Sequence, residues 1–108
     1  MVDVKRIQEG NYDLLTVVGD VDASSSIELD NAIEEAIESG GKKFLIDCSN
    51  LDYISSAGLG VLEEFRKRDI TMIIYGLNEK VANVFEILGL DQLLVIKQTK
   101  EEAKAALG

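Results

Sequence analysis

Residues 51–62 read LDYISSAGLGVL, and this stretch joins the end of a predicted strand to the start of a predicted helix. Ser55 and Ser56 are expected at or beside the helix N-cap, where a hydroxyl group satisfies an otherwise unpaired backbone N–H. Gly58 and Gly60 follow in the first turns, although each glycine costs a helix about 1 kcal/mol relative to alanine. We infer that a neighbouring strand or a partner protein approaches the helix backbone closely here.

Outward from this stretch, the chain opens with two strand-like segments and then alternates between helices and strands. The dipeptide Gly10-Asn11 separates the first two segments and predicts a hairpin turn. Apolar residues at helical spacing predict the helices, and short apolar runs predict the later strands. The predicted elements are strands at 2–9 and 12–18, a helix through 29–37, a strand at 43–47, a helix at 55–68, a strand at 70–75, a helix at 79–88, a strand at 93–96 and a helix ending at 107.

Polar residues at three of the expected helix starts have the pattern of caps. Ser25 with Glu28, and Thr99 with Glu102, match the capping box, in which each side chain accepts a hydrogen bond from the other residue's backbone N–H. Asn78 is expected to cap the helix between them by accepting from a free N–H group. These residues therefore predict where the helices begin.

The length of the chain and the absence of a linker-like segment indicate one domain, residues 1–108. The sequence contains no proline, low-complexity tract or block of charge that would mark a linker. The predicted order of elements is ββαβαβαβα. Helical crossovers favour parallel pairing of the later strands, whereas the opening hairpin makes the first pair antiparallel. We predict an α/β fold in which helices pack on a mixed sheet.

The composition is acidic, with 20 Asp and Glu residues against 11 Lys and Arg and a formal net charge of −9. Such a surface repels phosphate backbones and anionic lipid, so direct binding to nucleic acid or to a membrane is disfavoured. It favours a monomer and a partner protein with a basic docking face. The N-terminal residues lack the apolar run of a signal peptide, and no segment approaches the roughly 20 apolar residues of a membrane span. We expect a cytoplasmic protein.

Few residues of this chain are suited to catalysis or to metal binding. Histidine is absent, which removes the commonest general base and the usual catalytic triads. Cys48 is the single cysteine, so neither an internal disulfide nor a His/Cys metal site can form. The Gly58-Leu59-Gly60 run lacks the third glycine and the context of a dinucleotide-binding fingerprint. We expect a protein that is not an enzyme and that uses no cofactor.

The paired serines allow two interpretations. A phosphoryl group adds about −1.5 to −2 charges and is received favourably at a helix N-terminus. Four aspartates are expected at the same end of the sheet, where they would repel that added charge: Asp20, Asp22, Asp47 and Asp52. Phosphorylation would then alter a docking surface without unfolding the domain. Residue types alone favour a plain helix cap over a phosphorylation site.

The same stretch resembles a known family. Residues 54–62 are similar to the signature loop and helix start of STAS domains, which occur in bacterial anti-sigma-factor antagonists. The resemblance extends over nearly the whole chain. Residues 19–22, GDVD, resemble the Gly-Glu-Leu-Asp type segment that follows the second strand of the family, and residues 45–51, LIDCSNL, resemble the strand that leads into the signature loop.

The resemblance implies partner switching. The unphosphorylated antagonist binds an anti-sigma factor that is also a serine kinase and so frees the sigma factor, phosphorylation breaks the complex, and a serine phosphatase restores binding. The family's phosphorylated serine corresponds to Ser56, with Ser55 as the alternative. The family usually has aspartate where this chain has Ser55, and a second hydroxyl residue where it has Ala57. The residues implied to face the partner are Asp20, Asp22, Ser55, Ser56, Ala57, Gly58 and Leu59.

Two other interpretations stay open at this point. The chain could be a STAS subunit that docks constitutively on a transporter or a sensory complex, with both serines acting only as caps. Alternatively, Asp20, Asp47 and Lys97 at strand ends are similar to the acidic metal pocket of a receiver domain phosphorylated on Asp47. Receiver domains open with a βα unit, so the predicted opening hairpin disfavours this second alternative.

Overall fold

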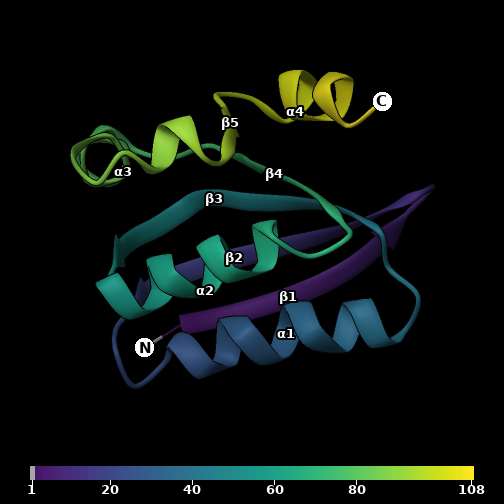
Figure 1. Ribbon diagram of the computed structural model, residues 1–108, viewed down its shortest axis with the longest axis horizontal. Helices are drawn as coiled ribbons and strands as arrows, with labels where there is room; N and C mark the ends of the chain where they lie inside the picture. Colours follow the sequence, from purple (N-terminus) through teal and green to yellow (C-terminus); the bar gives the residue numbers. More distant parts are fainter. Residues whose placement is uncertain (1) are drawn as a thin grey trace.

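Residues 2–108 are described by a computed structural model, which shows a five-stranded mixed sheet with helices on both faces (Figure 1). None of the helices formed by these residues is long and apolar enough to cross a membrane. The elements in chain order are β1 (Val2–Glu9), β2 (Tyr12–Val21), α1 (Ser26–Glu38), β3 (Lys43–Ile54), α2 (Ser56–Arg66), β4 (Thr71–Tyr75), α3 (Glu79–Ile87), the 3₁₀ helix η1 (Leu90–Gln92), β5 (Val95–Lys97) and α4 (Lys100–Leu107).

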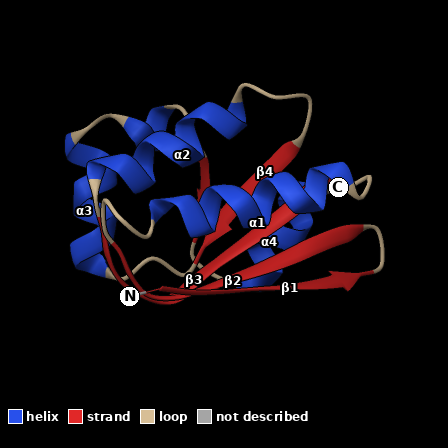
Figure 2. Cartoon of the chain, turned by 90° about the horizontal axis from the view of Figure 1, so that it is seen from below, coloured by secondary structure: helices blue, strands red, loops and turns tan. Residues whose placement is uncertain are grey.

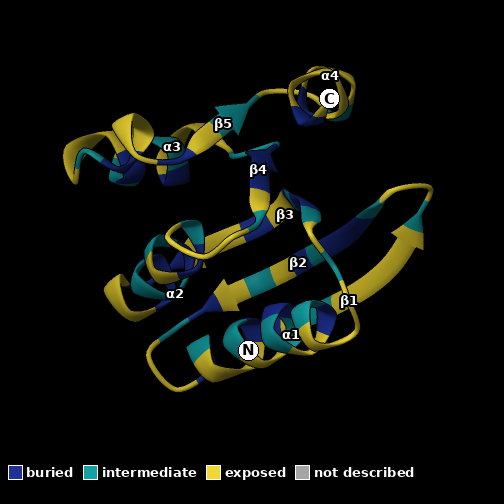
Figure 3. Cartoon of the chain, turned by 45° about the vertical axis from the view of Figure 1, so that its right-hand side comes forward, coloured by how far each residue is buried: buried dark blue, intermediate teal, exposed yellow. Residues whose placement is uncertain are grey.

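The sheet has the strand order β1-β2-β3-β4-β5. β1 pairs with β2 in antiparallel orientation through the predicted hairpin, and every later pair is parallel. Each parallel pair is joined through a helix, which gives the chain the distance it needs to return to the same end of the sheet. The predicted order of elements and the predicted mixed sheet are confirmed. β1 is an edge strand, and most of its residues are exposed (Figure 3).

Two layers of helices cover the sheet. The larger core cluster joins α1, α2 and α3 to one face, and Figure 2 shows α1 and α2 lying along that face. A smaller cluster joins α4 to the opposite face through Ala103 and Leu107. Successive side chains of a strand point to opposite faces of the sheet, which explains the two clusters. Leu14 and Leu45 belong to the cluster with α4, whereas their neighbours Leu15 and Ile46 belong to the larger cluster.

The third strand is much longer than predicted. We expected a strand at 43–47 followed by a loop, but β3 continues to Ile54. Parallel pairing with β2 persists to the Val21–Ile54 pair, across two register shifts that adjust the spacing. β4 pairs with β3 only as far as Asp47, so the second half of β3 has one neighbour and carries exposed polar residues. That polarity is typical of a loop, which is why the sequence alone predicts a loop after Asp47.

Two of the three predicted caps are confirmed. The side chain of Asn78 accepts from Val81 N at 2.8 Å, and Thr99 and Glu102 form the complete capping box. The capping box predicted for Ser25 and Glu28 is wrong. Ser25 is the N-cap residue of α1, but its hydroxyl makes no capping bond with the helix and is bonded instead to the preceding loop. The 3₁₀ helix η1 was not predicted.

Candidate functional site

The two serines at the start of α2 have different surroundings. Ser55 is the N-cap residue and is only 9% exposed, and its Oγ accepts a hydrogen bond from Gly58 N at 3.2 Å. Its backbone N–H donates to Val21 O at 2.7 Å, which ties the helix start to the end of β2. Ser56 is the first residue of α2 and is exposed. The cap role therefore belongs to Ser55, and the Ser56 hydroxyl is accessible to a partner.

The two glycines of α2 also differ. A Cβ atom added at Gly58 would lie 2.7 Å from Val21 Cγ1 and 2.8 Å from Ile54 Cγ1, so the ends of β2 and β3 require glycine there. A Cβ atom added at Gly60 would meet nothing within 4 Å. The sequence suggested that either a neighbouring strand or a partner protein approaches these glycines. Close packing against strands explains Gly58 but does not explain Gly60.

This difference predicts opposite effects on stability. Gly58→Ala is expected to destabilise the fold by about 1–2 kcal/mol, because overpacking of some 1–3 kcal/mol outweighs the gain in helix propensity. The two atoms that it meets belong to β-branched side chains, which are stiff about χ1. Gly60→Ala is the matched control and is expected to stabilise the helix by up to about 1 kcal/mol. Chemical denaturation of both variants measures the difference, and equal stabilities would contradict the packing role of Gly58.

The loop between β2 and α1 is fastened by Asp22. Its Oδ1 atom accepts from Ser24 Oγ, Ser25 N and Ser25 Oγ at 2.8–2.9 Å, while Ser25 Oγ accepts from Asp22 N. The hydrogen bonds from Ser24 and Ser25 lower the pKa of Asp22 to about 2. Asp22 therefore carries its negative charge throughout the physiological pH range. Asp22 therefore acts on the loop that leads into α1.

The structure brings most of the predicted partner-facing residues to one end of the sheet. Asp20 pairs with Tyr53 in the parallel ladder, directly before Val21 contacts the start of α2. Asp20, Ser56 and Ala57 are exposed there, whereas Gly58 and Leu59 are buried, with Leu59 in the core.

One of the four predicted aspartates lies elsewhere, so the expected clustering at one end is wrong for it. Asp47 lies six residues before Tyr53 along β3, about 20 Å away in an extended strand. The cause is the unexpected length of β3, which carries the helix start far beyond Asp47. Asp47 accepts hydrogen bonds from Ser49, and its strand partners are Thr16 and Tyr75. Asp20 and Asp47 therefore do not form the receiver-type pocket considered from the sequence.

A shallow groove lies beside the exposed serine, with a volume of about 240 Å³. One wall is α2, which contributes Ser56, Gly60 and Glu63, and the other is the end of α3 with the start of η1, which contributes Leu88 and Leu90. The sequence pattern did not indicate this groove, because its two walls are separated by more than twenty residues of chain.

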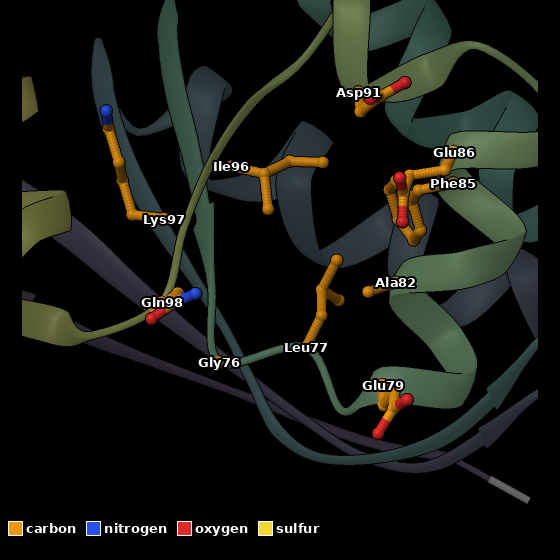
Figure 4. Close-up of a pocket in the computed structure, with 10 residues that line it drawn as sticks. All are labelled: Gly76, Leu77, Glu79, Ala82, Phe85, Glu86, Asp91, Ile96, Lys97 and Gln98. Atoms are coloured by element: carbon orange, nitrogen blue, oxygen red, sulfur yellow. The ribbon is translucent and has the colours of Figure 1, made fainter.

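A larger hollow of about 630 Å³ lies between α3 and β5 (Figure 4). Leu77, Phe85 and Ile96 supply apolar surface, and the carboxylates of Glu86 and Asp91 lie on one side of it (Figure 4). None of its lining residues is shared with the groove beside Ser56. The hollow is therefore separate from the paired serines.

The single cysteine is buried within the sheet and belongs to the larger core cluster. Burial, with a smaller contribution from the charge of Asp47, raises the pKa of the Cys48 thiol to about 12. The thiol is therefore protonated at neutral pH and is not reactive. Within residues 2–108, no group of three or more His, Cys, Asp or Glu residues is arranged to hold a metal ion.

Comparisons with known proteins agree with the resemblance drawn from the sequence. The chain is 28% identical over 105 residues to the anti-sigma-B factor antagonist of Listeria monocytogenes, across 94% of this chain and 91% of that protein. Its structure is similar to that of an anti-sigma factor antagonist from Mycobacterium paratuberculosis, with a TM-score of 0.91 at 17% identity over 99% of this chain and 94% of that one.

The structure is also similar to that of the Bacillus cell fate determinant SpoIIAA in its phosphorylated form, with a TM-score of 0.70 at 17% identity over 100% of both chains. The family model described as the STAS domain matches residues 4–103, nearly the whole chain. Because this match covers far more than half of the sequence, the chain belongs to the STAS domain family.

Proposed function

We propose that this chain is an anti-sigma-factor antagonist that works by partner switching. In its unphosphorylated form it binds an anti-sigma factor that is also a serine kinase, and this binding frees the sigma factor. Phosphorylation of Ser56 by the same kinase breaks the complex, and a serine phosphatase restores it. The chain acts in the cytoplasm as a binding protein and catalyses no reaction itself.

The observation that carries the proposal is the contrast between the two serines. Ser55 is buried and committed to the cap of α2, so a kinase would have to open the helix start to reach it. Ser56 is exposed one residue further on, at the first position of the helix. A phosphoryl group on Ser56 would lie near the free N–H groups and the positive end of the helix dipole, which stabilise an anion.

The surrounding charge explains how such a phosphate would act on binding. Asp20 is exposed in β2 beside the α2 start, and Asp22 in the next loop is ionised at neutral pH because its pKa is lowered to about 2. The phosphate would add to this negative field while the helix terminus keeps the domain folded. In an interface that fits unmodified Ser56, the added phosphate would be a buried charge without a positive partner. Burying such a charge is strongly unfavourable.

The relatives support the same activity. The Listeria monocytogenes protein is named an anti-sigma-B factor antagonist, and SpoIIAA is known in a phosphorylated form. The proposed partner-facing surface comprises Asp20, Asp22, Ser55, Ser56, Ala57, Gly58 and Leu59, of which Gly58 and Leu59 contribute by shaping the start of α2.

Phosphorylation at Ser56 is the first test. Incubating the protein with each purified serine-kinase anti-sigma factor of its host and ATP is expected to add a single phosphate, which peptide mass spectrometry locates on Ser56. The Ser56→Ala variant is the control and is expected to stay unmodified. A phosphate confined to Ser55, or no phosphate with a kinase that demonstrably binds, would show that the site is wrong.

A second function is favoured by one feature of the sequence. The usual aspartate of the family is Ser55 here, and the second hydroxyl residue is Ala57. A STAS subunit that docks constitutively on a transporter or a sensory complex needs no kinase site, and the two changes fit that role. The stoichiometry of phosphate on protein purified from the native host distinguishes the two functions, since constitutive docking predicts none under any growth condition.

A further inference from the structure

We propose that the groove between α2 and the α3–η1 corner receives an apolar side chain of the anti-sigma factor, with Gly60 in one wall and Leu88 in the other. This inference rests on the proposed function and adds to it a defined anchor point for the partner. It concerns residues outside the signature stretch as well as within it, because Leu88 is the C-cap residue of another helix, α3.

The first support is the unexplained glycine. Gly60 lies inside α2, where glycine costs about 1 kcal/mol relative to alanine. Unlike Gly58, it makes no close approach to any described part of the protein, since a Cβ atom there would have open space for 4 Å. Gly60 does, however, line the groove, on the same face of α2 as Ser56 and Glu63. The missing side chain therefore leaves room for something from outside.

The second support is exposed apolar surface at the opposite wall. Leu88 follows α3 and is 55% exposed although it lines the groove, and its neighbour Ile87 is 82% exposed. Neither side chain is needed to fill the interior, because Val81 and Phe85 already supply the buried face of α3. Adjacent large apolar side chains at a helix end are typical of a surface that a partner covers.

The size of the groove identifies the kind of occupant. Its volume of about 240 Å³ is below the roughly 300–1,000 Å³ of pockets that bind small molecules. It suits a single protruding side chain, which is how central anchors of protein interfaces are held. With a formal net charge of −9, the protein favours an anchor on a basic segment of the partner.

The position of the groove connects this anchor to the phosphorylation site. Ser56 lines the groove one helical turn before Gly60, on the same face of α2. A phosphate on Ser56 would place charge at the mouth of a site built for an apolar group. The groove therefore gives a specific reason why phosphorylation would release the partner, namely that the anchor and the phosphate compete for the same space.

The test uses two groove variants and one matched control, titrated by calorimetry against the purified serine-kinase anti-sigma factor that phosphorylates Ser56. Leu88→Ala and Gly60→Ala are each expected to weaken binding by about tenfold or more, as for a residue at an interface anchor. Leu93→Ala is the control, because Leu93 is 46% exposed but does not line the groove, and it is expected to bind within about twofold of the wild type.

Gly60→Ala is the decisive variant, because its loss of affinity is expected together with an unchanged or raised melting temperature. If Gly60 only supported the fold, its replacement would lower affinity and melting temperature together. If both groove variants bind with wild-type affinity while Ser56→Asp binds more weakly, the groove does not hold an anchor of the partner, and the proposed function stands. Failure of the wild-type chain to bind any serine-kinase anti-sigma factor of its host would overturn the proposed function and, with it, the assigned occupant.

Discussion

The Ser56→Asp variant is expected to bind the anti-sigma factor at least about 100-fold more weakly than Ser56→Ala, which corresponds to some 3 kcal/mol. The aspartate places a charge on an exposed residue that the proposed complex would bury, where an unpaired charge is costly. Ser56→Ala removes only a hydroxyl that does not cap the helix, since Ser55 does so, and it is expected to keep wild-type affinity and to resist release by ATP.

The fold is expected to survive both substitutions, because a negative charge at a helix N-terminus is neutral or mildly stabilising. Thermal melts of the two variants check this. Ala105→Asp is a control for charge alone, since it adds the same charge to an exposed position of α4, on the opposite face of the sheet. Equal affinities for Ser56→Asp and Ser56→Ala would place Ser56 outside the interface and favour constitutive docking.

Phe85→Ala is expected to lower the free energy of unfolding by about 3–5 kcal/mol. Phe85 is 1% exposed and is the largest buried side chain of α3, where it joins the core shared with α1 and α2. Because α3 leads directly into Leu88, the substitution is also expected to loosen one wall of the groove. The melting temperature is expected to fall by about 12 °C or more for a domain of this size.

Ile87→Ala is the matched control for this measurement. Ile87 lies two residues further along α3 and is 82% exposed, so its truncation is expected to change stability by no more than about 0.5 kcal/mol. Urea denaturation of both variants measures the two losses on the same scale. A loss below about 1 kcal/mol for Phe85→Ala would mean that α3 does not depend on the core contact described above.

Much of the fold was predictable because its signals are local. The Gly10-Asn11 turn predicted the hairpin, and the alternation of helices and strands then predicted the parallel pairing of the rest of the sheet. Asn78 and the Thr99–Glu102 pair predicted where α3 and α4 begin, since a cap depends on residues three positions apart. Each of these signals is contained within a few residues of sequence.

The errors occurred where a group takes a partner other than the one that its local pattern suggests. Ser25 has the sequence of a helix cap, but its hydroxyl is bonded to Asp22 in the folded loop. β3 extends through polar residues because β2 pairs with it as far as Val21, and no property of residues 48–54 alone reveals that partner. The displacement of Asp47 from the other aspartates follows from the same pairing.

The sequence by itself determined the order of the elements, the acidic surface and the segment that carries the paired serines. Residue types alone did not show which serine caps the helix or which glycine packs against the strands, because each pair shares one residue type and one helix turn. Only the tertiary structure decided between them: Ser55 and Gly58 face the ends of β2 and β3, whereas Ser56 and Gly60 face a groove closed by α3. Which face of a helix is buried depends on elements that are far away in the sequence and pack against it only in the folded protein.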